Sequence, residues 1–358
     1  MNNRRQVMTV LGPLAPEQLG VTLPHEHVFC DITCLCPPPQ DEDRREFLER
    51  PVEMGILGLI RRDPLFNRDN CLLDDVDLAA QEILEFKKLG GGTIVDLTSE
   101  KVVGRDPVAL QAVARATGVN IICGCGHYLH FVHPPAVAEE TMEAIAEQLV
   151  VELDEGIGDT GVRPGIIGEI GTSDPIHPQE VKMLGAAARA QQKTGAAITV
   201  HCNLGTRTGA QVLRLLDEAG ADLSRVVLGH VDFALGHLDV SFEGAVSYHK
   251  QLASSGCFIE YDTVGADGYF RGTGAERPFW APSDRQRAEA IARLLDAGLG
   301  DQVLISHDIC LKHYLLHYGG FGYGHILREF RHNLMDAGLG EADVHRLLVE
   351  NPARMLAH

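Results

Sequence analysis

The chain has 358 residues, of which 45% are hydrophobic and 23% charged, a composition typical of a soluble globular protein with a large core. Its 31 basic and 50 acidic side chains give a formal net charge of −19, so it lacks the basic surface that nucleic acids and anionic membranes require. No apolar run is long enough for a membrane span or a signal peptide, and the nine cysteines are interpreted as reduced thiols. We therefore expect a cytoplasmic protein that acts on a small molecule.

The first element is a β-type run that contains His25-Glu26-His27 and ends near Asp31. Alternate side chains of a strand point to the same face, so His25 and His27 can both reach one metal ion. Residues 32–76 lack clear periodicity, and we expect a long loop there with one short helix. A loop of this length is uncommon without a functional role.

After residue 76, segments with helical periodicity alternate with buried strands. The expected strands are 93–98, 120–126, 165–171, 197–202, 225–230, 257–262 and 302–308. Among the expected helices, Asp77 caps the first, one long helix follows Pro135, and helical sequence from about Gly324 closes the chain.

Together with the first run, these segments make about eight strands, each followed by a helix except where residues 32–76 intervene. This repetition predicts an α/β fold, a (β/α)8 TIM barrel that forms a single domain over residues 1–358. A doubly wound open sheet is the main rival. It is disfavoured because no Gly-x-Gly-x-x-Gly fingerprint follows an early strand.

Active sites of (β/α)8 barrels lie at the C-terminal ends of the strands. Five of the expected strand ends carry residues of the types that bind metals: His25, His27, Glu169, His201, His230 and Asp308. Four imidazoles and two carboxylates at one rim fit two divalent ions per chain. Zinc is expected first, with manganese or cobalt as alternatives.

We expect His25, His27 and Asp308 to hold one ion and His201 and His230 to hold the other. The Glu169 carboxylate is expected to bridge the two ions. Two ions about 3.5–4 Å apart can share a hydroxide that attacks a carbonyl or phosphoryl centre. The ion held by His201 and His230 would polarise the oxygen under attack. Asp308 would accept the proton of the hydroxide and pass it to the leaving group or to solvent.

Several short segments spread over the chain form a specific set: Thr9-Val10-Leu11-Gly12, Leu23-Pro24-His25-Glu26-His27, Gly168-Glu169-Ile170-Gly171, Val200-His201, Leu228-Gly229-His230-Val231-Asp232, Ser306-His307-Asp308 and Glu350-Asn351-Pro352-Ala353-Arg354. With them, nearly the whole chain resembles the phosphotriesterase-related proteins of the amidohydrolase superfamily. The resemblance implies a binuclear metal centre at the residues named above and a homodimer. It also implies hydrolysis of lactones, carboxylic esters or organophosphate esters.

Two positions depart from the pattern of that family. Many members bridge their metals with a carbamylated lysine at the end of strand four, where this chain has Glu169, so it resembles the glutamate-bridged branch. The best-studied phosphotriesterases have a proton-carrying histidine after the aspartate that ends strand seven, where this chain has Thr263 after Asp262. Efficient triester hydrolysis is therefore not favoured. Asp232 and Asp262 are expected to support the metal ligands by hydrogen bonds.

Three residues are candidates for contact with the substrate. Tyr128 matches a position that is often Tyr in the lactonases of the family, and it could hydrogen-bond the bridging oxygen or a bound lactone. A plain rim aromatic is equally consistent with that position. Arg271 and Lys312, in the loops after strands seven and eight, could bind a phosphate or carboxylate, although solvated loop charge is the simpler interpretation.

Three functions are consistent with these residues. The favoured one is a two-metal lactonase or carboxylesterase, and the second is a phosphoester hydrolase of the phosphotriester type. The third is a catalytically weak barrel that binds a ligand. Asp308 argues against the third, because a binding protein needs no proton acceptor beside a hydroxide.

Overall fold

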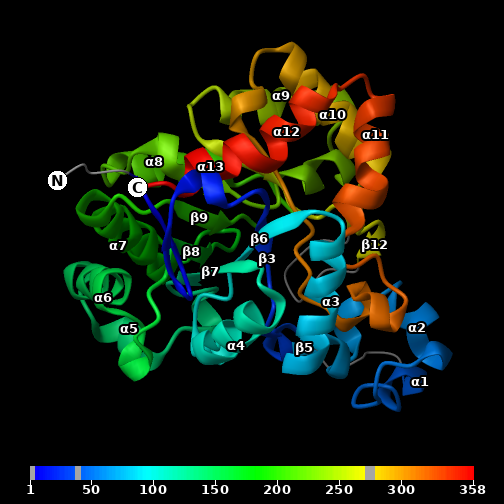
Figure 1. The fold of residues 1–358 in the computed structure, drawn as a ribbon, viewed down its shortest axis with the longest axis horizontal. Helices are drawn as coiled ribbons and strands as arrows, with labels where there is room; N and C mark the ends of the chain where they lie inside the picture. The colour runs from blue at the N-terminus through cyan, green and yellow to red at the C-terminus, as the bar shows by residue number, and fades with distance from the viewer. Residues whose placement is uncertain (1–4, 37–41, 271–278) are drawn as a thin grey trace.

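Eight parallel strands lie side by side in the computed structural model, in the order β14-β11-β10-β9-β8-β7-β6-β3, and helices surround them (Figure 1). The order follows the chain, so each strand pairs with the strand that precedes it in the barrel. The structure describes residues 5–36, 42–270 and 279–358. The predicted (β/α)8 barrel is confirmed.

The barrel strands are β3 (Val21–Glu26), β6 (Gly91–Asp96), β7 (Asn120–Cys125), β8 (Ile166–Gly171), β9 (Ile198–His201), β10 (Val226–Leu228), β11 (Phe258–Tyr261) and β14 (Val303–Ile305). Three short antiparallel pairs lie outside the barrel: β1 (Val7–Thr9) with β2 (Gly12–Leu14), β4 (Cys30–Asp31) with β5 (Leu72–Leu73), and β12 (Gly268–Phe270) with β13 (Phe279–Ala281). The first barrel strand thus ends at Glu26 and not near Asp31, which belongs to β4.

The helices are α1 (Glu42–Arg45), α2 (Met54–Ile60), α3 (Val76–Lys88), α4 (Pro107–Thr117), α5 (Pro135–Glu139), α6 (Met142–Glu155), α7 (Pro178–Thr194), α8 (Gly209–Glu218), α9 (Phe242–Ala253), α10 (Asp284–Asp296), α11 (Arg331–Asp336), α12 (Glu341–His345) and α13 (Asn351–Leu356). Asp75 and not Asp77 caps α3, and Thr141 divides the expected long helix by capping α6. Within the described ranges, no helix is long and apolar enough to cross a membrane.

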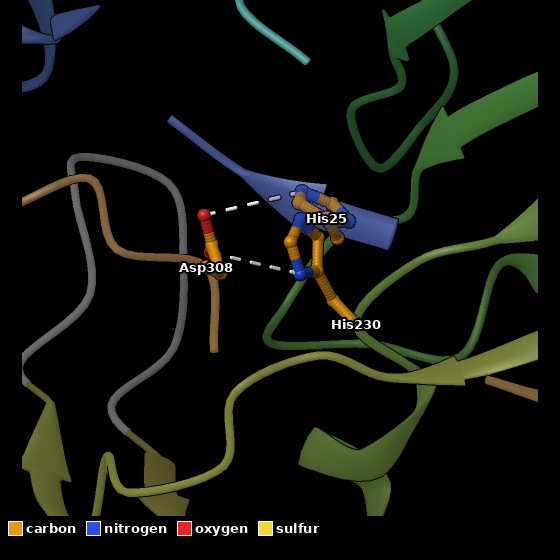
Figure 2. Close-up of side chains that lie close together, drawn as sticks. All are labelled: His25, His230 and Asp308. Atoms are coloured by element: carbon orange, nitrogen blue, oxygen red, sulfur yellow. Dashed lines mark ion pairs between the residues drawn. The ribbon is translucent and has the colours of Figure 1, made fainter. Parts of the chain in front are cut away.

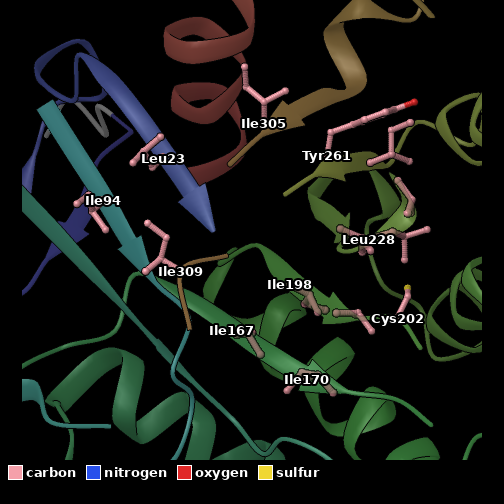
Figure 3. Packing of buried hydrophobic residues seen from close by; sticks show 14 of the residues in the cluster. Leu23, Ile94, Ile167, Ile170, Ile198, Cys202, Leu228, Tyr261, Ile305 and Ile309 are labelled. Atoms are coloured by element: carbon pink, nitrogen blue, oxygen red, sulfur yellow. The ribbon is translucent and has the colours of Figure 1, made fainter. Parts of the chain in front are cut away.

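Side chains of the strands alternate between two hydrophobic clusters. Ile94, Ile167 and Leu228 belong to the large cluster that also contains helix residues (Figure 3). Their neighbours Val95 and Val227 belong to a smaller cluster made mainly of strand residues and both chain termini. The smaller cluster therefore fills the barrel, and the larger one joins the strands to the surrounding helices.

The seam between the last strand and the first is closed by side chains. The buried Glu26 carboxylate accepts hydrogen bonds from the Ser306 hydroxyl (2.8 Å), from His307 N (3.0 Å) and Nδ1 (2.8 Å), and from Ile309 N (3.0 Å). The Ser306 hydroxyl also accepts from the backbone N–H of His25 at 3.1 Å. Glu26 thus fixes the segment after β14 that carries Asp308.

The segment between β3 and α3 differs from the expected loop. It contains two helices, α1 and α2, and its strand β5 returns to pair with β4 (Figure 1). Val52, Ile56, Ile60 and Phe66 form a separate small hydrophobic cluster there. Helix α2 has only seven residues, which is too short for its i, i+4 pair Ile56 and Ile60 to establish a helical period in the sequence.

Candidate metal centre

The barrel brings all six predicted metal ligands to one rim. His25 lies in β3, Glu169 in β8 and His201 at the end of β9. His230 follows β10 by two residues, and Asp308 follows β14 by three. Figure 2 shows His25 on its strand and His230 and Asp308 on the segments that follow β10 and β14, with the three side chains facing one another.

Glu169 lies at the centre of this group. Its Oε1 atom is 2.9 Å from His230 Nε2, 3.1 Å from His201 Nδ1 and 3.4 Å from His25 Nε2. Two ligand atoms on a tetrahedral zinc ion with bonds of about 2.0–2.1 Å lie about 3.3 Å apart. The spacing around Glu169 therefore suits ligand atoms that share a cation.

Asp308 completes the group on the side of the first strand. Its Oδ1 atom is 3.3 Å from His27 Nε2 and 3.9 Å from His25 Nε2. Three overlapping sets made of the predicted ligands have their ligand atoms within 4.8 Å of one another: His25, His27 and Glu169; Glu169, His201 and His230; and His25, His230 and Asp308. A fourth set joins His25 to Glu260 and Asp262. Overlapping sets of this kind can hold two ions that share Glu169.

The tautomers of the histidines fit metal binding. Thr98 donates its hydroxyl proton to Phe29 O, so it accepts from His27 Nδ1 (2.8 Å) and leaves His27 Nε2 as a free acceptor. The Nδ1 atoms of His25 and His230 lie 3.1 and 3.0 Å from the carboxylate of Asp262. Within the part of the chain that the structure describes, the buried His25 Nε2 has no hydrogen-bond partner. A cation would satisfy that atom.

The charges of the group also favour a cation. Burial alone would lower the pKa of His25 and His230, but the carboxylates of Asp262 and Glu169 and the hydrogen bonds to the rings together outweigh burial and raise the pKa of both well above the ordinary value. Burial would raise the pKa of Glu169, but the charges of His201 and His25 together with the hydrogen bonds from His201 and His230 outweigh burial and hold that pKa well below its usual range. The group therefore favours positive charge at the imidazoles, whether a proton or a metal ion carries it.

Two of the candidate ligands have unusual backbone conformations. His230 has φ 59° and Asp308 has φ 52°, and elsewhere in the described ranges only glycines have positive φ. Such conformations are strained for residues with a Cβ atom and cluster at functional sites. The strain thus coincides with two side chains that face the same rim.

A small cavity opens on this group. Its volume is about 120 Å³, and apolar side chains such as Leu65, Leu97, Leu204 and Phe233 line it beside Glu169 and the histidines. Tyr128 also lines it, with its hydroxyl 3.3 Å from His201 Nδ1. Burial raises the pKa of Tyr128 well above its ordinary value, so the phenol is neutral and can donate a hydrogen bond.

The remaining predicted residues are placed differently. The Lys312 ammonium forms an ion pair with Asp69 at 2.6 Å, and Lys312 does not line the cavity. Asp232 contacts no predicted metal ligand and accepts instead from Arg287 Nε (2.7 Å) and Thr263 Oγ1 (2.5 Å). Arg271 lies outside the described residues.

Two supporting residues were missed by the sequence analysis. Glu260 is buried with its Oε2 atom 3.0 Å from His25 Nδ1, and Thr98 holds His27. Glu260 and Asp262 are two residues apart on one strand, the same spacing that singled out His25 and His27. That spacing could have indicated Glu260, whereas Thr98 had no comparable signal.

Comparisons with known proteins agree with this geometry. The chain is 35% identical over 357 residues to the N-acetyltaurine hydrolase of Danio rerio, covering 99% of this chain and 98% of that protein. A solved resiniferatoxin-binding protein from Rhodobacter sphaeroides is 38% identical, has a TM-score of 0.92 and covers 98% of this chain and 94% of its own. A lactonase from Listeria monocytogenes is 27% identical, has a TM-score of 0.76 and covers 98% of both chains. The model of the phosphotriesterase family matches residues 5–356, and the chain belongs to that family of hydrolases.

Proposed function

We propose that this protein is a two-metal hydrolase that cleaves a lactone or another carboxylic ester. The observation that carries the proposal is the position of Glu169 Oε1, which lies within 3.4 Å of nitrogens from His25, His201 and His230. One carboxylate oxygen shared by three imidazoles is the arrangement expected of a bridging ligand. Zinc, a homodimer and a cytoplasmic location belong to the same proposal.

His25, His27 and Asp308 would hold one ion, His201 and His230 the other, and Glu169 would bridge them. Two divalent ions, when bound, supply Lewis acidity toward water and toward the carbonyl oxygen of the substrate. Asp308 accepts the proton of the attacking water, because its side chain is 18% exposed and lies at the cavity. Tyr128 donates a hydrogen bond to the oxygen of the substrate.

A second candidate is hydrolysis of an amide. It is favoured by the several relatives named N-acetyltaurine hydrolase, which match nearly the whole chain. The chemistry requires the same residues, except that Asp308 must return its proton to the departing amine, which is a poorer leaving group than an alkoxide. Phosphotriester hydrolysis is less favoured, because Thr263 is engaged by Asp232 and Arg287 and carries no titratable group.

A hydrolysis screen with Asp308→Asn tests the proposal. Metal-loaded protein is offered γ- and δ-lactones, simple esters, N-acetyl amides and a phosphotriester, and proton release is followed with an indicator. The exposed Asp217→Asn on α8 is the matched control. We expect turnover of lactones or esters that falls at least 100-fold in Asp308→Asn and is unchanged in Asp217→Asn. Full activity in Asp308→Asn would exclude Asp308 as proton acceptor, and binding without turnover would favour the ligand-binding alternative.

A further inference from the structure

A second, larger cavity lies next to the small cavity at the metal centre. It has a volume of about 790 Å³. Pro64, Ala266 and Tyr314 line both cavities, so the two adjoin along these three side chains. The larger cavity, here called the vestibule, is built from α1, from α2 and the residues after it, from the β12–β13 pair and the residues before it, and from the segment after β14.

The small cavity can hold only part of a substrate of ordinary size. An engineered cavity of about 150 Å³ in another protein accommodates benzene, so 120 Å³ accommodates a group no larger than that. Ligand sites for whole small molecules are typically about 300–1,000 Å³. A substrate larger than this, with its reacting bond at Glu169 and Asp308, extends beyond the small cavity, and the vestibule adjoins that cavity.

The charges of the two cavities differ. No lysine or arginine lines the small cavity in the part of the chain that the structure describes. Among the residues that the structure describes, three arginines line the vestibule: Arg44, Arg61 and Arg62. Asp267 is the one carboxylate among the described lining residues, so the vestibule carries positive charge on a chain with a net charge of −19.

The three arginines are held in different ways. Arg44 forms an ion pair with Asp63 at 2.6 Å, so its charge is largely compensated. Arg61 donates to Gly319 O at 2.5 Å, which positions its guanidinium without neutralising it. In the described ranges no carboxylate pairs with Arg61 or Arg62, and the two lie next to each other at the end of α2.

We propose that the vestibule binds the anionic end of the substrate through Arg61 and Arg62. The ligand class is a sulfonate, carboxylate or phosphate joined by a short apolar spacer to the bond that is cleaved. A guanidinium matches the planar pair of oxygens that each of these groups offers. That the bound anion is part of a substrate rests on the proposed function. The anion site itself is inferred from the residues that line the vestibule.

The vestibule contains its own spectroscopic reporter. The chain has a single tryptophan, Trp280, which is 50% exposed, lines the vestibule and packs against Tyr269 with a ring-centroid distance of 5.3 Å. Its fluorescence therefore reports the local potential and ligand binding in this cavity, with no other tryptophan contributing. This measurement requires neither turnover nor metal.

Two fluorescence experiments test the anion site. The first compares quenching of Trp280 by iodide and by caesium, and we expect iodide to quench more strongly despite the net negative charge of the chain. The second titrates sodium butane-1-sulfonate, pentanoate and butyl phosphate against neutral butan-1-ol. We expect saturable changes with anions alone, and the strongest of the three anions identifies the group that the site prefers.

The double variant Arg61→Gln/Arg62→Gln supplies the decisive comparison. Glutamine at position 61 keeps a donor for Gly319 O. The control variant, Arg115→Gln/Arg214→Gln, removes the same total charge from exposed positions on α4 and α8. We expect anion affinity to fall at least about fivefold and the preference for iodide to disappear in the vestibule variant, with no change in the control. Equal quenching by caesium in the wild type, or equal anion affinity in the vestibule variant, overturns the proposal.

The hydrolysis assay separates this proposal from the proposed function. If the enzyme is active, the vestibule variant loses activity on anionic esters or amides and retains it on neutral ones. If no compound is hydrolysed, the proposed function fails while the fluorescence results still decide whether the vestibule binds anions.

Discussion

Replacement of Glu26 tests how the barrel is closed. The carboxylate accepts four hydrogen bonds, three at Oε1 and one at Oε2 from Ile309 N. Glutamine can keep the three bonds to its oxygen, but its NH2 group then faces the N–H of Ile309. The variant Glu26→Gln therefore loses one bond to a charged acceptor and leaves a buried donor unpaired, at a cost of about 1–3 kcal/mol.

The cost translates into a measurable shift of the melting temperature. An unfolding entropy of about 2.1 cal/mol/K per residue over 358 residues gives about 0.75 kcal/mol/K. Glu26→Gln should therefore unfold about 1–4 °C below the wild type. Glu26→Ala leaves all four donors without their acceptor, costs about 3–5 kcal/mol and should unfold about 4–7 °C lower.

Thermal unfolding followed by circular dichroism measures this order, with Glu85→Gln, a partly exposed position on α3, as the control. Activity should fall more than stability, because Glu26 holds both neighbours of Asp308. His307 Nε2 accepts from Ile326 N at 3.1 Å, so the ring donates from Nδ1 and depends on Glu26 as its acceptor. If both variants melt within 1 °C of Glu85→Gln, the role assigned to Glu26 is wrong.

Three further predictions follow from the buried polar contacts. Thr98→Val removes the acceptor of His27 Nδ1 and should lower the metal affinity, measured by equilibrium dialysis, about 10- to 100-fold. Thr199→Val should have little effect, because the buried Thr199 hydroxyl has no hydrogen-bond partner among the described residues. Burial lowers the pKa of His249 to about 4, so only the unfolded chain takes up a proton there between pH 6.5 and pH 4. The free energy of unfolding should therefore fall by about 3 kcal/mol over that range, and in denaturant titrations His249→Gln should show a smaller fall. Chelation should lower the melting temperature and added zinc should restore it, while a melting temperature insensitive to both would exclude tight metal binding.

The fold and the gathering of the candidate metal ligands at one rim could be predicted because their signals are local. The alternation of strands and helices depends on residue periodicity, and each predicted ligand lies where a buried strand ends. The short strand β10 shows where such local signals fail. The strand was expected to span residues 225–230 and to end at His230, but β10 ends two residues before His230, which has a positive φ. The position of His230 at the rim was predicted, but its left-handed backbone was not.

The surroundings of the metal centre could not be predicted, since they depend on contacts between distant segments. Lys312 was a candidate for contact with a substrate, whereas the structure pairs its ammonium with Asp69. That pairing could not be predicted, because Asp69 lies 243 residues earlier in the chain. Likewise, Arg61 and Arg62 were expected in a long loop with one short helix, and only the structure shows that they follow α2 and line a cavity with the segment after β14. Such pairings carry no periodic signal in a single sequence.

The central claim is that Glu169 bridges two metal ions. An anomalous difference map from crystals of the zinc-loaded protein, collected at the zinc absorption edge, tests this most directly. We predict two peaks about 3.5–4 Å apart on either side of the Glu169 carboxylate, one beside His25 and His27 and the other beside His201 and His230. A single peak, or two peaks that Glu169 does not contact, would contradict it.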